Sequence, residues 1–329
     1  MIIFYTNVYP TEKRPSEGTF IRNIAAMFDK TELSVLYKDK VGIIGYVNFY
    51  FEVVKSILTQ PDDVHVFHFP TFTALPVPFM MLFLKRKVIY WYHGSDVFCR
   101  TSMSRLLFIL STFNLRSVNF VVPSQFLENA LKSRLGEIKI SVIPTSGVPD
   151  SVYQSREPRL DRLVIISRLI KEKGVLNFVK LYNESNLHEY YTLEIIGQGE
   201  DYASLKELEK VNSKILVVGG LSHNDALEHL RRSRVMIMPS LLPESLSLVV
   251  LEAMASGVLV VARRVGNIPY LIEDKINGYT FTSDSEAIAI LRKIWSADTR
   301  ELICRAAYCA DAFRQSKVKE ITRSYFEGF

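Results

Sequence analysis

Two glutamates stand where a ligand could meet a predicted buried helix. Glu244 and Glu252 are separated by seven residues, and the stretch 246–262 is apolar or small apart from Glu252. A helix that is apolar all round is typical of a protein core, where an unpaired carboxylate is costly. Glu252 therefore needs a hydrogen-bonding partner, and the paired hydroxyls of a ligand would serve.

The start of this helix is a predicted phosphate-binding site. The amides of Leu246, Ser247 and Leu248 form its N-terminus, where unpaired N–H groups and the helix dipole favour an anion. Glu244 precedes them, so its side chain projects beside the helix start. A purely structural interpretation lets Glu244 interact with the helix dipole and gives Glu252 a partner inside the protein. The two carboxylates together favour a functional site.

Basic residues follow a predicted strand that ends at residue 167. Arg168 and Lys173 stand in the segment ISRLIKEKGV. Cations at the carboxyl end of a parallel strand lie at the ligand-binding edge of the sheet, where they could neutralise a diphosphate. The alternative is a solvated charged loop, which is the common interpretation of such a run.

Three histidines are placed near strand ends. His93 follows the predicted strand 87–92, at the edge where ligands bind, and its structural alternative is a capping or core histidine. His65 and His68 are three residues apart in another predicted strand, so they point to opposite faces and are poorly placed to share a metal. We expect structural or acceptor-lining roles for both.

Runs rich in Val and Ile alternate with helix-length segments along the whole chain. Unbroken apolar runs are typical of strands buried on both faces, and their alternation with helices predicts parallel βαβ units. The sequence thus predicts two doubly wound, Rossmann-like α/β domains. The first contains strands at 2–6, 33–37, 64–69, 87–92, 118–122 and 139–143, and the second contains strands at 163–167, 192–196, 214–218, 234–238, 258–262 and 279–282.

A polar, proline-containing passage at 149–162 marks the predicted domain boundary. We expect one domain at 1–150 and the other at 151–311. Ligands of doubly wound sheets bind outside the carboxyl ends of the strands, so the site is expected in a cleft that the two domains face.

The last segment, about 312–329, is predicted to be an amphipathic helix that packs back on the first domain. Val318, Ile321 and Tyr325 recur in it at helical spacing. These residues are expected to have structural roles and no part in catalysis.

Composition narrows the class of protein. The chain has 329 residues, and 40 Lys and Arg against 35 Asp and Glu give a net charge of +5. This charge suits a phosphorylated ligand or an anionic surface and does not indicate nucleic acid. Cys99, Cys304 and Cys309 match neither a zinc spacing nor paired disulfides, which favours a reducing compartment. The start MIIFYTNVYP reads as a strand without a signal peptide, and no apolar stretch reaches the ~20 residues of a membrane span.

Taken together, these segments resemble one family. Glu244 and Glu252 match the Glu-x7-Glu signature of the GT-B glycosyltransferases, specifically the large retaining family 4. The resemblance runs over nearly the whole chain. Its further segments are YHGSD at 92–96, VPSQF at 122–126, IPTSGVP at 143–149, SRLIKEKG at 167–174, IIGQGED at 195–201, VGNIPYLIED at 265–274 and NGYTF at 277–281.

The resemblance implies roles for the residues of the second domain. In the family, the glutamate matched by Glu252 binds the ribose hydroxyls of the donor nucleotide, and the one matched by Glu244 contacts the donor sugar. Arg168 and Lys173 match the basic pair that holds the donor diphosphate. The 1–150 domain would then bind the acceptor, and the 151–311 domain the nucleotide sugar.

Two residues of the first domain also match the family. His93 matches a histidine near the reacting sugar, and Gly18 matches a glycine-rich loop that approaches the diphosphate. The chain departs from the family pattern at two places: Glu17 precedes Gly18 where two glycines are common, and Ser247 replaces a common glycine. The first departure concerns the contact of the loop with the diphosphate, and the second alters the sugar pocket.

The predicted chemistry needs no metal and no cofactor. Leaving of a nucleoside diphosphate builds negative charge, which fixed cations and helix amides would stabilise. The chain has no Asp-x-Asp triplet, and the nearest acidic triplet, 284–286, coincides with a predicted helix start capped by Ser283. The family implies a retaining reaction, with same-face attack assisted by the leaving phosphate.

The resemblance also implies the partners. The donor would be a UDP- or GDP-sugar, and the acceptor a glycan or lipid-linked molecule of surface polysaccharide biosynthesis. The segment PVPFMMLFLKRK, residues 76–87, sets apolar residues against three cations and suits peripheral binding to an anionic membrane. Its alternative is a buried helix that leads into the next strand. We expect a cytoplasmic enzyme, peripheral on the inner face of the membrane.

Two other classes remain as alternatives. A Rossmann oxidoreductase would use Gly197 and Gly199, but Tyr202 occupies the place of the third glycine of its motif. A non-catalytic sugar-nucleotide-binding protein would share the fold without the activity. A nicotinamide absorbance change would identify the first class, and donor binding without hydrolysis the second.

Overall fold

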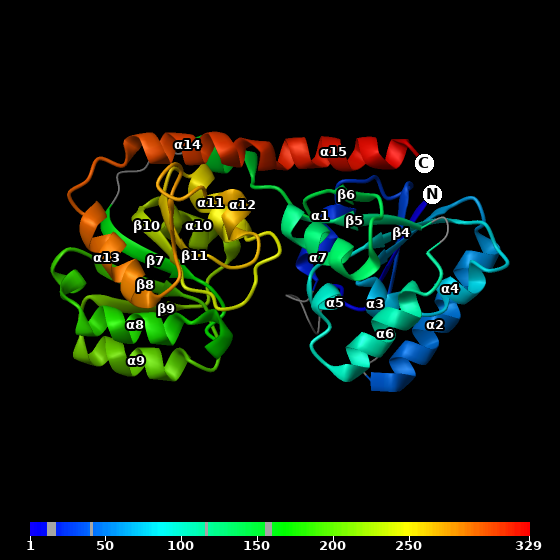
Figure 1. Cartoon of the computed structure of the whole chain (residues 1–329), viewed down its shortest axis with the longest axis horizontal. Coiled ribbons are helices and arrows are strands. Elements are labelled where there is room, and N and C mark those ends of the chain that lie inside the picture. The colour runs from blue at the N-terminus through cyan, green and yellow to red at the C-terminus, as the bar shows by residue number, and fades with distance from the viewer. Residues whose placement is uncertain (12–17, 40–41, 116–117, 155–159) are drawn as a thin grey trace. The chain divides into compact units, whose positions relative to one another are not determined.

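The computed structural model describes residues 1–11, 18–39, 42–115, 118–154 and 160–329. These residues form two compact units (Figure 1). Unit 1 comprises Met1–Ser146 with Lys317–Phe329, and unit 2 comprises Gly147–Ser316. The boundary predicted from the sequence falls slightly later, after residue 150, and residues 155–159 of the predicted linker lie outside the described residues.

Unit 1 is built on a six-stranded sheet in the order β2-β1-β3-β4-β5-β6. All neighbouring strands are parallel. One face is covered by α2 to α7, and the other by α1 and the C-terminal helix α15. The strands are β1 (Ile2–Thr6), β2 (Leu33–Tyr37), β3 (Val64–His68), β4 (Lys87–Trp91), β5 (Val118–Val122) and β6 (Ile140–Val142). The helices are α1 (Thr19–Ala25), α2 (Gly42–Thr59), α3 (Pro70–Thr73), α4 (Val77–Met80), α5 (Ser95–Phe98), α6 (Ser102–Thr112), α7 (Gln125–Leu135) and α15 (Gln315–Glu327), which begins in unit 2.

Unit 2 has a second parallel six-stranded sheet, in the order β12-β11-β10-β7-β8-β9. Helices α8, α9 and α13 cover one face, and α10, α11 and α14 cover the other. The strands are β7 (Leu160–Ile166), β8 (Thr192–Ile196), β9 (Ile215–Gly219), β10 (Ser233–Met238), β11 (Leu259–Arg263) and β12 (Tyr279–Phe281). The α-helices are α8 (Val175–Glu184), α9 (Tyr202–Val211), α10 (His223–Arg231), α11 (Leu248–Ala255), α12 (Ile268–Leu271), α13 (Asp284–Ile294) and α14 (Arg300–Ala310), and the 3₁₀ turns are Asp150–Gln154, Lys171–Lys173, Asn186–Glu189 and Asp311–Phe313.

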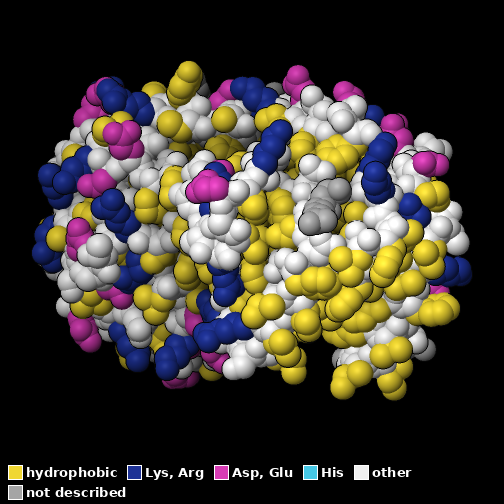
Figure 2. Space-filling view, turned by 45° about the vertical axis from the view of Figure 1, so that its right-hand side comes forward, with side chains coloured by type: hydrophobic (Ala, Val, Ile, Leu, Met, Phe, Trp, Pro, Cys, Tyr) yellow, Lys and Arg dark blue, Asp and Glu magenta, His cyan; other side chains and the backbone are white. Residues whose placement is uncertain are grey.

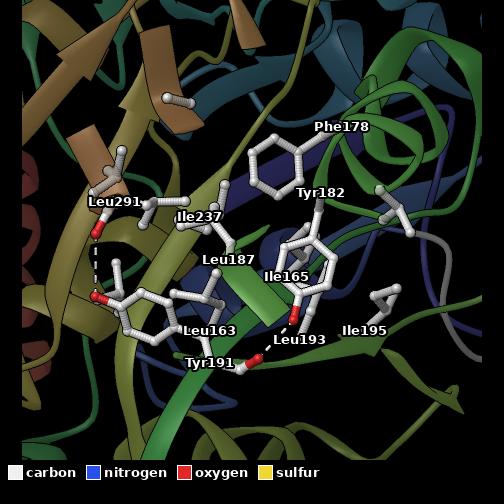
Figure 3. Close-up of a cluster of buried hydrophobic side chains, with 14 of the residues drawn as sticks. Leu163, Ile165, Phe178, Tyr182, Leu187, Tyr191, Leu193, Ile195, Ile237 and Leu291 are labelled. Atoms are coloured by element: carbon white, nitrogen blue, oxygen red, sulfur yellow. Dashed lines mark hydrogen bonds between the residues drawn. The ribbon is translucent and has the colours of Figure 1, made fainter. Parts of the chain in front are cut away.

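The core of unit 2 shows why its strands are continuous apolar runs. Leu163 and Ile165 of β7 pack with Leu193 of β8 against Phe178 and Tyr182 of α8, and all five are fully buried (Figure 3). Burial also demands partners for the tyrosine hydroxyls. The Tyr182 hydroxyl donates to the backbone carbonyl of residue 191 at 2.6 Å, which ties α8 to the start of β8.

The strand orders define where a ligand can enter each unit. In both sheets the direction of winding reverses once, between β1 and β3 in unit 1 and between β7 and β10 in unit 2. Doubly wound sheets bind ligands at such a switch point, outside the carboxyl ends of the two strands.

The two α/β units and all twelve predicted strands are confirmed by the structure, with bounds that differ by a few residues at some ends.

Helix α15 packs on unit 1 as predicted, but through a different stripe. Its buried residues are Val318, Thr322 and Phe326, and Phe326 packs edge-to-face on Phe28. Ile321, which is expected from its spacing on the apolar face, is 46% exposed. The stripe follows the i, i+4, i+8 positions, so the small polar Thr322 takes the buried place and satisfies its hydroxyl on the Val318 carbonyl.

The segment 76–87 is neither fully buried nor fully exposed. Val77 and Met81 enter the core, whereas Phe79, Leu82 and Phe83 remain exposed. The short helix α4 thus presents its apolar residues in two directions. No helix in the described ranges is long and apolar enough to cross a membrane.

Candidate active site

A cavity opens at the switch point of unit 2. Its volume is about 180 Å³, and it lies between the segments that follow β7 and β10. Five of the residues predicted to act on a donor line it together. They are Arg168, Lys173, Glu244, Ser247 and Leu248.

The glycines of the IIGQGED segment, Gly197 and Gly199, pack against the segment after β7, which lines one side of this cavity. A Cβ on Gly197 would lie 1.8 Å from the Ser167 carbonyl oxygen, and one on Gly199 would lie 2.2 Å from that of Leu169. The Leu169 amide also donates to the Gln198 carbonyl at 2.8 Å. Both glycines therefore pack against the segment that carries Arg168. This packing accounts for both glycines without the dinucleotide of the oxidoreductase interpretation.

Lys173 and Glu244 form an ion pair at the cavity. The Lys173 ammonium donates to Glu244 Oε1 at 2.6 Å, and the two side chains are 14% and 20% exposed. The following residue, Gly174, has a positive φ, and a Cβ there would lie 2.6 Å from the Pro239 carbonyl oxygen. Only glycine lets the Lys173 segment approach β10 this closely.

Arg168 is the exposed cation of the site. Its side chain lines the cavity and is exposed. It makes no hydrogen bond or ion pair with the residues that the structure describes. Because the Lys173 charge is partly balanced by Glu244, Arg168 supplies the net positive charge of this edge.

Gly266 supports Glu244, and it was not among the residues predicted for the site. With φ near +57°, a Cβ on Gly266 would lie 2.3 Å from the Glu244 backbone nitrogen. The next amide, of Asn267, donates to the Glu244 carbonyl at 2.8 Å. The backbone of Glu244 is thus fixed by a loop after β11. The glycine in VGNIP was the available signal, but its contact is invisible in the sequence.

Helix α11 begins at Leu248, with Ser247 as its N-cap. Its first intrahelical bonds run from the amides of Val250 and Leu251 to the Ser247 carbonyl. The amides before Val250 stay outside the helical ladder, and Ser247, Leu248 and Val249 line the cavity. The Leu246 side chain is buried in the core and does not line the cavity, whereas the prediction for Leu246 concerns its amide.

Glu252 lies one turn further along α11 and does not line this cavity. The residue is buried, and its Oε1 accepts from His223 Nε2 at 2.7 Å. His223 begins α10, directly beyond β9, and its side chain is 59% exposed. The hydrogen bond to Glu252 raises the pKa of His223. The structure therefore gives Glu252 a protein partner, as the structural interpretation of the sequence required.

Unit 1 places His93 against a second histidine. His93 Nε2 lies 2.9 Å from His68 Nδ1, so one ring donates and the other accepts. Burial lowers the pKa of His68 to about 3 and that of His93 well below its usual range. Both rings are therefore neutral at physiological pH. His68 stacks on Trp91, and its ring is fully buried.

Asp96 fixes the backbone around His93. Its Oδ1 accepts from the amides of His93 at 3.1 Å and Gly94 at 2.8 Å. Burial nevertheless raises the pKa of Asp96 to about 7. His65 serves a different purpose, since its Nδ1 pairs with the Tyr5 hydroxyl at 2.8 Å on the opposite face of the sheet. The predicted divergence of His65 and His68 is confirmed.

Gly18 is the N-cap of α1, with φ near +64°. A Cβ at this position would lie 2.6 Å from the Val8 carbonyl oxygen, which explains the need for glycine. Two residues later, the Phe20 ring lies 4.8 Å from the ring of His93. Gly18 and His93 thus belong to one region of unit 1. Glu17, which departs from the family pattern, lies outside the described residues.

The acidic triplet 284–286 has a structural role. Asp284 pairs with the Arg263 guanidinium, and Ser283 accepts from the Glu286 amide as the N-cap of α13. The predicted cap is confirmed. In the described ranges no group of three His, Cys, Asp or Glu side chains is arranged to hold a metal ion.

These features agree with the comparison to known proteins. Residues 154–301 match the family model described as glycosyl transferases group 1. The match covers most of unit 2, including every residue of the cavity. Over the whole chain the fold is GT-B: HepE of Anabaena in complex with UDP superposes with a TM-score of 0.77, 16% identity and 100% of each chain covered. The same protein in complex with UDP-glucose gives a TM-score of 0.75 at 15% identity, again with 100% of both chains covered.

Curated relatives match over shorter stretches. A lipopolysaccharide 1,2-N-acetylglucosaminetransferase of Salmonella typhimurium is 24% identical over 196 residues, which cover 53% of this chain and 51% of that protein. An N-acetyl-alpha-D-glucosaminyl L-malate synthase of Bacillus anthracis is 32% identical over 120 residues, covering 36% of this chain and 31% of that protein. The chain thus spans about half or less of the length of these two relatives.

Proposed function

We propose that the protein is a glycosyltransferase that moves a sugar from a nucleotide-diphosphate sugar to a glycan or lipid-linked acceptor. One observation carries the proposal: the unit 2 cavity gathers Arg168, Lys173, Glu244 and the start of α11 inside the stretch that matches the group 1 family. The complexes of HepE with UDP and UDP-glucose support a uridine nucleotide as the donor.

The cavity fits the leaving group of this reaction. Cleavage of the sugar–phosphate bond transfers negative charge to the diphosphate, and fixed positive groups that meet this charge lower the barrier. Arg168 and Lys173 would meet the diphosphate from one side. The α11 amides that stay outside the helical ladder would meet it from the other. Glu244, held by Lys173 and by the Gly266 loop, would face the donor sugar.

Glu252 would bind the ribose hydroxyls in exchange for its contact with His223. His223 is exposed on its outer side and can turn into solvent at little cost, whereas Glu252 is buried and fixed in α11. A ribose would then replace one hydrogen-bond donor with two. This exchange makes donor binding compete with the ion pair of Glu252 and His223.

The remaining parts of the mechanism follow from the resemblance to the retaining family. The sugar would be a hexose delivered with retention, by same-face attack that the leaving phosphate assists. No step needs a metal ion, because side-chain cations and amides meet the developing charge. His93 would contact the reacting sugar as a neutral imidazole, with His68 fixing its ring, and the Gly18 loop would approach the diphosphate.

We propose surface polysaccharide biosynthesis as the setting. The Salmonella relative acts, by its name, on lipopolysaccharide, which supports a glycan or lipid-linked acceptor. The enzyme would work in the cytoplasm, on the inner face of the membrane, with unit 1 binding the acceptor.

Nucleoside diphosphate release tests the proposal. The purified chain is incubated with UDP- and GDP-sugars, with EDTA present, and free diphosphate is measured while thermal shift reports binding. We expect slow release from one donor, and a specific donor at roughly 100 times its Kd should stabilise the protein by ~2.7 kcal/mol. Stabilisation without any release, even with acceptor extracts, would indicate the non-catalytic binding protein. Absence of both effects for every nucleotide sugar would refute the proposal.

A further inference from the structure

Unit 1 carries many exposed apolar side chains on three neighbouring elements. Figure 2 shows hydrophobic side chains gathered over α2, α4 and α6 on one face. Phe83 lies in residues 76–87, which contain α4 and are called the α4 segment, and it is 87% exposed. We call this surface the apolar face, and its members include Ile43, Val47, Phe51, Leu82, Phe83 and Ile109, each more than half exposed.

Direct contacts join the three elements into a single surface. Arg86, just beyond α4, donates from Nε to the Ile57 carbonyl of α2 at 3.0 Å. The Phe79 ring of α4 packs on the Phe113 ring after α6, with centroids 4.7 Å apart. These contacts hold α2 and α6 to the α4 segment. The exposed apolar side chains of the three elements therefore form one continuous surface.

The core of unit 1 does not require this apolar surface. Helix α2 already buries Phe49 and Val53 against the sheet, yet Val47 and Phe51 on its outer side are also large and apolar and remain exposed. A helix that is apolar on both sides is normally covered on both sides. Continuous apolar surface of this extent marks a place where another phase or molecule binds.

The charges near the apolar face are mostly positive. The stretches 42–59, 76–86 and 99–115 contain five basic residues and a single acidic residue. The basic residues are Lys55, Lys85, Arg86, Arg100 and Arg105, and the acidic one is Glu52, whereas Lys87 donates to the Phe329 carbonyl on the opposite face of the sheet. An apolar surface edged by cations matches a bilayer with anionic headgroups, where apolar side chains insert and cations remain at the surface.

We propose that the apolar face docks unit 1 on an anionic lipid bilayer. The insertion would involve α2, the α4 segment and α6 together, so the surface is wider than the segment 76–87 that the sequence suggests. The excess of cations favours lipid over a second copy of the chain, because two such faces would repel each other. The proposal concerns the acceptor side of the proposed function but depends only on the exposed face, so it can fail or hold independently of the donor chemistry.

Flotation with lipid vesicles tests this proposal. The full chain is mixed with vesicles of phosphatidylcholine alone or with phosphatidylglycerol, at low and high salt. We expect flotation with the anionic vesicles at low salt and release at high salt. The double variant Leu82→Ser with Phe83→Ser should bind about tenfold or more weakly, because two inserting side chains are lost. Its matched control is Tyr308→Ser, which removes an 83% exposed side chain from unit 2.

A charge variant separates electrostatic attraction from insertion. Lys85→Glu should weaken binding about tenfold at low salt, whereas Lys180→Glu in unit 2 should not. Arg86 is left intact because it holds the end of α2. Thermal unfolding and donor hydrolysis of each variant are measured in parallel and should match the wild type. Equal flotation with neutral vesicles, no flotation, or self-association in place of flotation would each overturn the proposal.

Discussion

Near the switch points of the two sheets, the same strand geometry carries charged groups in unit 2 and neutral groups in unit 1. In unit 2 the strand ends carry Arg168 and the pair of Lys173 with Glu244, all partly open to solvent. In unit 1 the strand ends carry His68 and His93, which burial keeps neutral. A parallel sheet therefore fixes where a ligand binds, and the residues after each strand decide its charge. Unit 2 suits a diphosphate, and unit 1 suits an uncharged hydroxyl-bearing group.

Removal of the cations should produce the largest effect. Arg168→Ala and Lys173→Ala should each lower kcat/KM about 10²–10³-fold, because charge on the leaving diphosphate is no longer met. The double variant should lose less than the product of the two, since both residues act on one group. Diphosphate release at several donor concentrations measures this, with Lys180→Ala as the control. Activity near that of the wild type in both single variants would remove the charged cavity from the mechanism.

Much of this difference was predictable, since strand ends are visible in a sequence. The apolar runs of β7 and β10 locate their carboxyl ends, and Arg168, Lys173 and Glu244 follow those ends at one edge of the sheet. The pairing of His68 with His93 was not predictable, because it depends on the register of β3 with β4, which sets His68 beside Trp91. The contact of Gly266 with Glu244 and that of His223 with Glu252 also join distant segments. Sequence spacing carries no information on such contacts.

The support of Glu244 should be the next most sensitive feature. Gly266→Ala places a Cβ 2.3 Å from the Glu244 nitrogen, whereas Gly42→Ala meets nothing within 4 Å although φ is also positive. The control should cost about 1 kcal/mol of unfolding free energy from backbone strain. Gly266→Ala should cost about 1–3 kcal/mol more. Urea unfolding gives both values, and equal losses would mean that the Gly266 contact does not constrain Glu244.

Loss of the neutral pair of His68 and His93 should lower kcat moderately, and the pair itself should add no pH dependence to kcat. His68→Ala should lower kcat about tenfold by freeing the His93 ring. His68→Asn should retain part of the kcat that His68→Ala loses, because its side chain supplies a polar atom near the Nδ1 position. Both rings stay neutral, so they should add no step to the kcat profile between about pH 6 and 8. A step from Asp96, whose pKa burial raises to about 7, should persist in His68→Ala. His65→Ala, on the opposite face of the sheet, should reduce stability and leave kcat intact. A step in that pH range that His68→Ala abolishes would show a charged pair instead.

The contact of His223 with Glu252 should have the smallest effect, and its sign is defined. The pKa of His223 is raised in the folded protein, so its stabilisation is complete below the unfolded pKa of about 6.5 and is lost as the pH rises through the folded value. Because His223 is largely exposed, the effect should stay below about 1 kcal/mol. The difference in unfolding free energy between the wild type and His223→Gln should therefore shrink from pH 5.5 to pH 8.5. A difference that grows with pH would contradict the pairing.

Hydrogen exchange with and without UDP tests the central claim most directly. The amides of Ser247, Leu248 and Val249 stand outside or at the start of α11 and should exchange rapidly in the free protein. Saturating UDP should slow exchange in peptides that contain them, and in those that contain Arg168 and Lys173, by about tenfold or more, while α6 of unit 1 stays unchanged. Unchanged exchange at both segments under saturating UDP, or protection confined to other parts of unit 2, would contradict a donor site at this switch point.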